Sequence, residues 1–343
     1  MLMRIQHETK LSYTLPVSET VFEVRMAPPS DEDQTSLSYR LKITPQAQVT
    51  SYRDGFGNRV DLFNVPGTYR ELVVSTTSFV RTHRRPAVDR LAGVPTAQVP
   101  ADDRPVSVEA MEYLQPSPLV PRGAGLDRFV AGLSTTPGSL AQTLRSVMTA
   151  VAGRLRYEKG VTRARTTASE ALELGVGVCQ DFSHLMIGAC RGLGLPARYV
   201  SGYVMHPGEI ATHAWCQVWG GEEVGWVDVD PTRSEFVCDE HVTTAVGRDY
   251  GDVPPNRGLW KGRAEESMNV AVTIEPVDRV PLEWNEWNLP AFRPMVMNGQ
   301  SQSQRQGPVT PRPSRPTRPA YPNQRSAGAS LVQQQGEQQQ QAG

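Results

Sequence analysis

One stretch, GVGVCQDFSHLMIGACRGLGLPARYVSGYV at residues 175–204, constrains the fold more than any other part of the chain. Apolar side chains recur at spacings of three and four along residues 179–193, which predicts an α-helix with a buried face. Gly194 and Pro196 cannot comfortably continue a helix, so the helix should end there. Cys179 then lies at the start of the helix. At this position it could be a buried core residue, a metal ligand or a nucleophile.

The elements around this helix predict an α+β domain. Residues 126–155 have helical spacing, and Thr167 with Glu170 predicts the capping box of a further short helix that ends at Gly175. Strands follow in ARYVSGYV, HAWCQVW and GWVDVDPT. The helices come first in the chain and the antiparallel strands second. This order is typical of an α+β domain, whereas alternating strands and helices build a parallel sheet.

The chain divides into four parts by composition. Residues 1–83 contain short runs of alternating apolar and polar side chains, which predict a small all-β sandwich. Residues 84–125 are rich in Pro, Gly and Asp and are expected to form a linker, with one helical candidate at VSVEAMEYL. Residues 126–297 hold the α+β domain. Residues 298–343 are rich in Gln, Pro, Ser, Gly and Arg, and we expect this tail to be disordered because it has almost nothing to bury.

Charge, hydropathy and cysteine usage bear on partners and location. The net charge of −1 gives no electrostatic reason to expect a nucleic acid partner. No run of about 18 apolar residues and no leader-like start are present, so we expect no membrane partner. Four cysteines are too few for a secreted disulfide scaffold, which favours free thiols and a cytoplasmic location.

The three chemistry-bearing segments together predict a nucleophilic site. The first turn of a helix favours a thiolate, and Cys179 occupies such a position. His213 opens the strand THAWCQVW, from where its imidazole can reach a helix N-terminus. Asp228 and Asp230 are two apart in GWVDVDPT and share one face of their strand. A thiolate, an imidazole and a carboxylate on rigid elements are the parts of a nucleophile, a general base and a group that orients the base.

These residues resemble a known family. GVCQDFSHLMIGACRGLGLPARYVSGYV, HAWCQVW and GWVDVDPT are similar to the bacterial transglutaminase-like superfamily, and the likeness continues through DEHVTTAVGRDYGDVPPNRGLWKG. The N-terminal strands resemble the β-rich domain that precedes the catalytic domain in many of these proteins, so the resemblance covers roughly residues 3–275. It implies a papain-like catalytic domain with a Cys-His-Asp triad and no cofactor. Carried over by motif, the triad falls on Cys179, His213 and Asp230, while Asp228 is a neighbour.

Four further residues near these motifs have expected roles. Gln180 and Trp215 are our candidates for substrate contacts, although the backbone N–H of Cys179 is the expected oxyanion donor. Asp181, in the first turn of the helix, should cap free N–H groups. His184, one turn further on, should be a structural histidine.

A metal site is not expected. CDEH places Cys238 and His241 three apart, on a loop that could bring in Cys216 or His206 as a further ligand. Structural zinc normally uses two close pairs of ligands, and only one such pair is present.

The sequence therefore predicts an enzyme that transfers acyl groups through a thioester, with a protein or peptide as substrate. Attack by water would make it a protease or amidase, which is the prediction we favour from the resemblance. Attack by a lysine amine would make it a glutamine-lysine crosslinking transglutaminase, and a non-catalytic binding module is the alternative from another class. The sequence predicts neither which protein or peptide is the substrate nor the oligomeric state.

Overall fold

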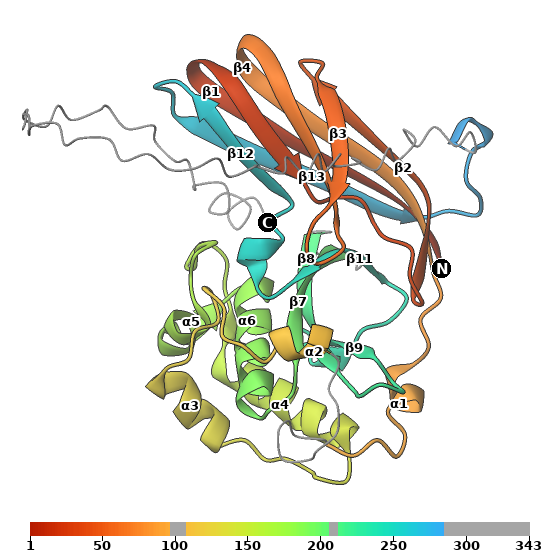
Figure 1. Ribbon diagram of the computed structural model, residues 1–343, viewed down its shortest axis with the longest axis vertical. Helices are drawn as coiled ribbons and strands as arrows, with labels where there is room; N and C mark the ends of the chain where they lie inside the picture. The colour runs from red at the N-terminus through yellow and green to blue at the C-terminus, as the bar shows by residue number, and fades with distance from the viewer. Residues whose placement is uncertain (97–107, 206–211, 285–343) are drawn as a thin grey trace, which may run out of the picture.

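The computed structural model describes residues 1–96, 108–205 and 212–284 and arranges them as two bodies (Figure 1). The upper body in this view is a β-sheet, and the lower body combines helices with a second sheet. The predictions for residues 97–107 of the linker and for the tail at 298–343 lie outside the described residues. Within the described part of the chain, no helix is long and apolar enough to span a membrane.

The upper body is one six-stranded antiparallel sheet. Its central strands are β1 (Leu2–Val24) and β4 (Arg59–Thr82), which pair along most of their length. β2 (Gln34–Thr44) and β3 (Gln48–Arg53) both pair with β4. Inward-facing side chains alternate with exposed ones as the sequence predicts, so the all-β character is confirmed, but hydrogen bonds join the strands into a single sheet instead of a two-sheet sandwich.

The last two strands of the upper sheet come from the far end of the chain. β12 (Asn256–Lys261) and β13 (Glu266–Pro276) both pair with β1. The predicted domain 126–297 therefore needs a correction, because residues 256–276 complete the first sheet. The physical reason is that β1 would otherwise expose unpaired backbone groups along its second edge, and these two strands satisfy them.

The lower body follows the predicted order of helices and then strands. Its sheet has the order β10-β9-β8-β7-β11 and is antiparallel throughout. The main helices are α3 (Ala124–Ala131), α4 (Leu140–Arg154), α5 (Ala168–Leu174) and α6 (Cys179–Gly192). The strands of the sheet are β7 (Ala197–Val204), β8 (Thr212–Trp219), β9 (Trp226–Asp230), β10 (Glu235–Phe236) and β11 (His241–Gly247). Two short strands, β5 (Arg156–Tyr157) and β6 (Val176–Gly177), pair in parallel beside α6, and 3-10 turns occupy Tyr250–Asp252 and Leu282–Trp284.

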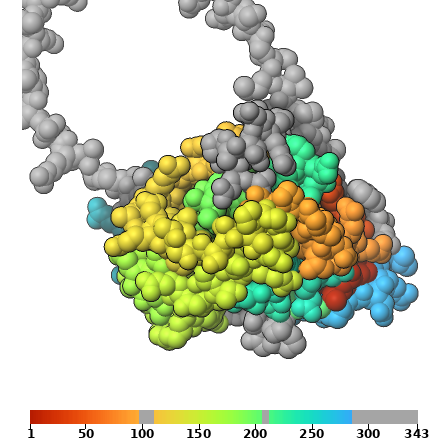
Figure 2. All heavy atoms as spheres, turned by 90° about the horizontal axis from the view of Figure 1, so that it is seen from below, coloured from red at the N-terminus to blue at the C-terminus, as the bar shows by residue number. Residues whose placement is uncertain are grey.

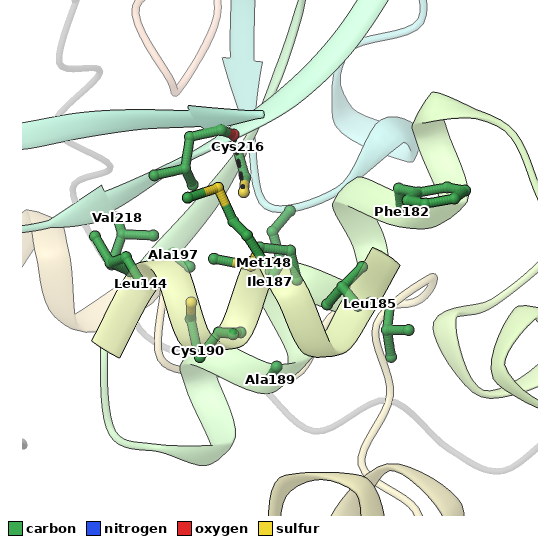
Figure 3. Packing of buried hydrophobic residues seen from close by; sticks show 14 of the residues in the cluster. Leu144, Met148, Phe182, Leu185, Ile187, Ala189, Cys190, Ala197, Cys216 and Val218 are labelled. Carbon is green, nitrogen blue, oxygen red and sulfur yellow. Dashed lines mark hydrogen bonds between the residues drawn. The ribbon is translucent and has the colours of Figure 1, made fainter. Parts of the chain in front are cut away.

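The core of the lower body lies between α6 and one face of its sheet. Leu185 and Cys190 of α6 pack in the same cluster as Cys216 and Val218 of β8 and Met148 of α4 (Figure 3). Because side chains alternate along a strand, the residues of β8 between these point to the opposite face, toward the upper sheet. That opposite face carries the polar residues of the site.

The linker runs along the lower body. It contains α1 (Ala87–Arg90) and α2 (Val108–Glu112), the second of which overlaps the helix expected at VSVEAMEYL. Figure 2 shows residues of the linker, in orange, beside the yellow and green helices on the face that points away from the upper sheet. The described parts of the linker thus pack on a surface of the lower body.

Candidate active site

Cys179 is the first residue of α6, and the turn before it is held by Asp181. The Oδ2 atom of Asp181 accepts hydrogen bonds from the backbone N–H of Val178 at 2.8 Å and from the Thr162 hydroxyl at 2.7 Å. This confirms the capping role expected for Asp181, which is buried, and burial raises its pKa to about 6. The Cys179 side chain is half-buried and unpaired with any other cysteine. The thiol is therefore fixed at the helix N-terminus but remains accessible.

His213 lies between the thiol and a carboxylate. Its Nε2 is 2.7 Å from Oδ2 of Asp230. Burial by itself lowers the pKa of His213, but hydrogen bonds with Asp230 and Cys179 and the charges of these partners raise the pKa to about 10. The structure thus brings Cys179, His213 and Asp230 together in the order that the sequence predicts.

Asp230 is fully buried at the end of β9, and both of its oxygens are engaged. Its Oδ1 accepts from the backbone N–H groups of Thr232 at 3.0 Å and Arg233 at 3.2 Å. Its Oδ2 accepts from His213 and faces His241 at 3.3 Å. Burial opposes ionisation, but the hydrogen bonds from the two histidines hold the pKa of Asp230 well below its usual range. The carboxylate is charged and cannot rotate away from His213 without losing several bonds.

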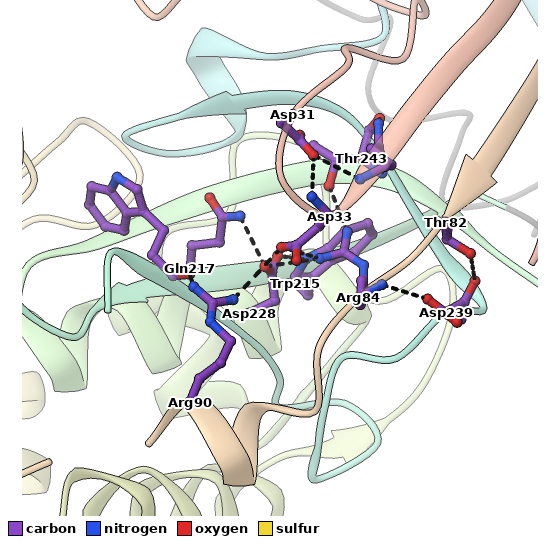
Figure 4. Close-up of polar contacts among 12 residues, drawn as sticks. Asp31, Asp33, Thr82, Arg84, Arg90, Trp215, Gln217, Asp228, Asp239 and Thr243 are labelled. Carbon is purple, nitrogen blue, oxygen red and sulfur yellow. Dashed lines mark hydrogen bonds and ion pairs between the residues drawn. The ribbon is translucent and has the colours of Figure 1, made fainter. Parts of the chain in front are cut away.

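Asp228 has a different task, at the junction of the two bodies (Figure 4). It accepts hydrogen bonds from Nε1 of Trp215 at 2.7 Å and from Nε2 of Gln217 at 3.1 Å. Arg84 of the linker lies 3.1 Å from Asp228 and 3.1 Å from Asp33 of the upper body. Asp228 is therefore not solvated. It ties the sheet that carries His213 to the linker.

Trp215 supports His213 from behind. Its ring stacks with the His213 ring at 6.2 Å between centroids and is fully buried. Gly202 of β7 pairs with His213, and an added Cβ at this glycine would lie 2.4 Å from the Trp215 ring and 2.3 Å from the carbonyl oxygen of Val242. Trp215 thus needs a glycine beside it. This corrects the prediction that Trp215 contacts the substrate, because a fully buried ring has no surface to offer.

Gln180 is also turned into the protein. Its side chain is nearly buried, and its Nε2 donates to the carbonyl oxygen of Ala164 at 3.2 Å. The amide so anchors the loop that precedes α5 next to the helix N-terminus. A substrate contact by Gln180 stays a prediction.

Sequence and structure comparisons place this arrangement in a family. The model of the transglutaminase-like superfamily matches residues 127–231, and the model of the bacterial transglutaminase-like N-terminal region matches residues 3–81. An uncharacterized protein of Mycobacterium leprae is 32% identical over 285 residues, which cover 79% of this chain and 98% of that protein. The chain belongs to the transglutaminase-like superfamily.

Other similar proteins also match most of the length of this chain. An uncharacterized protein of Mycobacterium tuberculosis is 32% identical over 294 residues, which cover 80% of this chain and 93% of that protein. Among solved structures, a candidate cysteine protease from Cytophaga hutchinsonii superposes with a TM-score of 0.66 at 23% identity and covers 82% of this chain and 93% of that one. The likeness confirms the fold of both bodies.

His184 has the structural position expected for it in this transglutaminase-like fold. It is fully buried in α6, and its Nε2 accepts a hydrogen bond from the backbone N–H of Tyr250 at 3.2 Å. Burial lowers the pKa of His184 to about 4. The ring is therefore neutral at pH 7 and joins α6 to the turn after β11.

His241 is the residue of the site that sequence reasoning missed. It begins β11, and its ring contacts Trp215 edge-on at 5.3 Å between centroids. Its Nε2 is 3.3 Å from Asp230, and its Nδ1 is 3.8 Å from Sγ of Cys238. The CDEH spacing is the sequence signal at this residue, and it indicates a pair of metal ligands without indicating a contact with Asp230.

Within the described part of the chain, one group of side chains could hold a metal ion. Ligand atoms of His213, Asp230 and His241 lie within 4.8 Å of one another. Hydrogen bonds from the two imidazoles to the carboxylate already account for this closeness. The absence of a metal cofactor stays a prediction.

Proposed function

We propose that this protein is a cysteine enzyme that cleaves peptide or glutamine side-chain amides through a thioester. The observation that carries the proposal is the chain of contacts from the half-buried thiol of Cys179 through His213 to Asp230, with 2.7 Å between the last two. Each member lies on a regular element, and a nucleophile, a base and an orienting group are what this chemistry needs.

The two ring nitrogens of His213 have different roles in the acylation step. Nε2 of His213 is bound to Asp230, so Nδ1 is the atom left to take the proton of the Cys179 thiol. The sulfur then attacks the carbonyl carbon of the amide, and the electron pair of the C=O bond moves to the oxygen. The backbone N–H of Cys179 is the oxyanion donor in this proposal, because it lies in the first turn of α6 where N–H groups point outward. Collapse of this intermediate breaks the C–N bond, and His213 gives its proton to the leaving amine.

Deacylation needs an acceptor for the thioester. We favour water, since water reaches a half-buried sulfur without a dedicated pocket, whereas an amine acceptor requires a site that excludes bulk water. His213, now neutral, takes a proton from the attacking water, and the C–S bond breaks to release the carboxylic acid and the thiol. Asp230 keeps the ring in one tautomer during both steps.

The test is mass spectrometry on a library of Gln-containing peptides incubated with the full chain and a fluorescent primary amine. Cleavage or a gain of one mass unit on glutamine, without uptake of the amine, supports hydrolysis. Uptake of the amine into peptides would replace hydrolysis with crosslinking chemistry.

Two variants sharpen this test. Cys179→Ala should abolish every product, and Cys179→Ser should retain binding but lose most of the rate, because a hydroxyl is a much weaker nucleophile than a thiol at neutral pH. Product formation that persists in Cys179→Ala would refute the assignment of the nucleophile. Peptide binding without products in the wild type would favour the non-catalytic module.

A further inference from the structure

A second thiol is connected to the catalytic carboxylate from the opposite side. Sγ of Cys238 is 3.8 Å from Nδ1 of His241, and Nε2 of His241 is 3.3 Å from Oδ2 of Asp230. The same oxygen of Asp230 binds His213. One carboxylate thus lies between two imidazoles, and each imidazole also contacts a cysteine.

The histidine and the cysteine of the second pair differ in exposure to solvent. His241 and Asp230 are fully buried, whereas Cys238 is exposed. The base is therefore protected from solvent, while the sulfur that it contacts is open to small molecules. The other two cysteines, Cys190 and Cys216, are fully buried and cannot react in the folded protein.

Local structure holds the second pair in place. Two turn residues separate Cys238 from β11, and the backbone N–H of His241 donates to the carbonyl oxygen of Cys238 at 3.1 Å. The ring of His241 cannot turn freely because it packs edge-on against Trp215. Sulfur and imidazole are thus held near each other by backbone and by packing.

Electrostatics in this pair favour a thiolate. The hydrogen bond with His241 is the main influence on the Cys238 thiol and lowers its pKa. Burial lowers the pKa of His241, but hydrogen bonds with Asp230 and Cys238 outweigh it and raise the pKa. The charge of Glu240 acts the other way on Cys238, since it adds a negative charge beside the sulfur.

We propose that Cys238 is a second reactive thiol, which forms mixed disulfides with small cationic or neutral disulfides in preference to anionic ones. The proton of Cys238 passes to Nδ1 of His241, and the sulfur attacks one sulfur atom of the small disulfide. The S–S bond of the reagent breaks as the new S–S bond forms, and the released thiolate takes up a proton. The carboxylate of Glu240 accounts for the preference, because it repels an anionic reagent. This site does not depend on the proposed function, since it uses neither Cys179 nor an amide substrate.

The experiment uses the full chain carrying Cys179→Ala, so that Cys238 is the one exposed cysteine left. The protein is treated at pH 7 with cystamine, a cationic disulfide, and with dithiodiglycolate, an anionic one, and adducts are located by mass spectrometry. We expect a single adduct at Cys238, formed faster than on the cysteines of the same chain unfolded in urea, and faster with cystamine than with dithiodiglycolate. A native Cys238 that reacts no faster than the unfolded cysteines would overturn the proposal.

Two variants identify the groups responsible. His241→Gln should slow the reaction of Cys238 about threefold or more, because the loss of thiolate outweighs the gain in intrinsic nucleophilicity. Glu240→Gln, at a partly exposed position, should bring the ratio of the two reagents toward that of the unfolded chain. Cys190 and Cys216 report on folding, since they stay unlabelled only while the core is intact. Unchanged rates in folded His241→Gln, or an unchanged ratio in Glu240→Gln, would each contradict the assignment.

Discussion

Replacing Asp230 by asparagine should move the titration of His213 by several pH units. In the parent protein, burial lowers the pKa of His213, but the bonds and charges of Asp230 and Cys179 raise the pKa to about 10. Asp230→Asn removes the negative charge and leaves the burial, so we expect the pKa of His213 to fall to about 6.5 or lower. At pH 8.5 the imidazolium fraction would then drop from about 97% to about 1%.

The direct assay is an NMR titration of the histidine Cε1–H signals. It is done in the Cys179→Ala background, so that Asp230 is the remaining partner of His213. His213 should titrate well above pH 7 in this protein and below about 6.5 once Asp230→Asn is added. Asp228→Asn is the matched control, because Asp228 binds Trp215 and not His213. A His213 that titrates near 6.5 with and without Asp230 would refute the electrostatic reasoning.

Asp230→Asn should also change how the free energy of unfolding depends on pH. A raised pKa in the folded state means that the stabilisation from His213 is fully present below about pH 6.5 and is lost as the pH rises toward about 10. Over that range the free energy of unfolding should fall by at most about 1.4 kcal/mol per pH unit. In Asp230→Asn this dependence should disappear, which chemical denaturation at several pH values would measure.

Substitutions at three further positions of the scaffold, two of them with a control variant, test the site by chemical denaturation. Gly202→Ala should destabilise the fold by about 1–3 kcal/mol and reduce turnover, because the new methyl group meets the Trp215 ring at 2.4 Å, and a variant as stable and active as the parent would contradict this packing. Arg84→Met leaves the buried carboxylate of Asp228 without its cation, while Asp33 keeps Arg90, and should cost about 3–5 kcal/mol, whereas Arg4→Met, in an exposed pair, should cost less than about 1 kcal/mol. Equal costs would show that the buried pair has no special role. Asp181→Ala should cost about 1–2 kcal/mol through loss of the cap before Cys179, and Asp181→Asn less, since its amide oxygen can still accept from Val178.

Much of the local structure followed from residue spacing. The helix expected over 179–193 is observed as Cys179–Gly192, and the capping box of Thr167 and Glu170 is present with Gly175 in the left-handed conformation. These features depend on neighbours within four residues, so the sequence contains all the information that they need. The strand assignment of His213 and the shared face of Asp228 and Asp230 depend on the same short-range alternation.

The roles of individual side chains were harder to predict from the sequence. Trp215 was expected at the substrate and lies behind His213, because the space made by Gly202 on the next strand is invisible in the sequence of β8. His241 was weighed only as a metal ligand, since nothing near it in the chain points to Asp230. Strand order decides such contacts.

The sequence by itself therefore determined much of the local secondary structure, the α+β order and the thiol and imidazole of the site, whereas the choice of Asp230 over Asp228 came from the family resemblance. Only the tertiary structure decided that β12 and β13 return to β1, that Arg84 of the linker binds Asp228, and that a second histidine shares the carboxylate. The reason is that hydrophobic spacing and capping act over a few residues. Pairing between strand edges and burial of charge join residues that are far apart in the chain, and many alternative pairings satisfy the same local pattern.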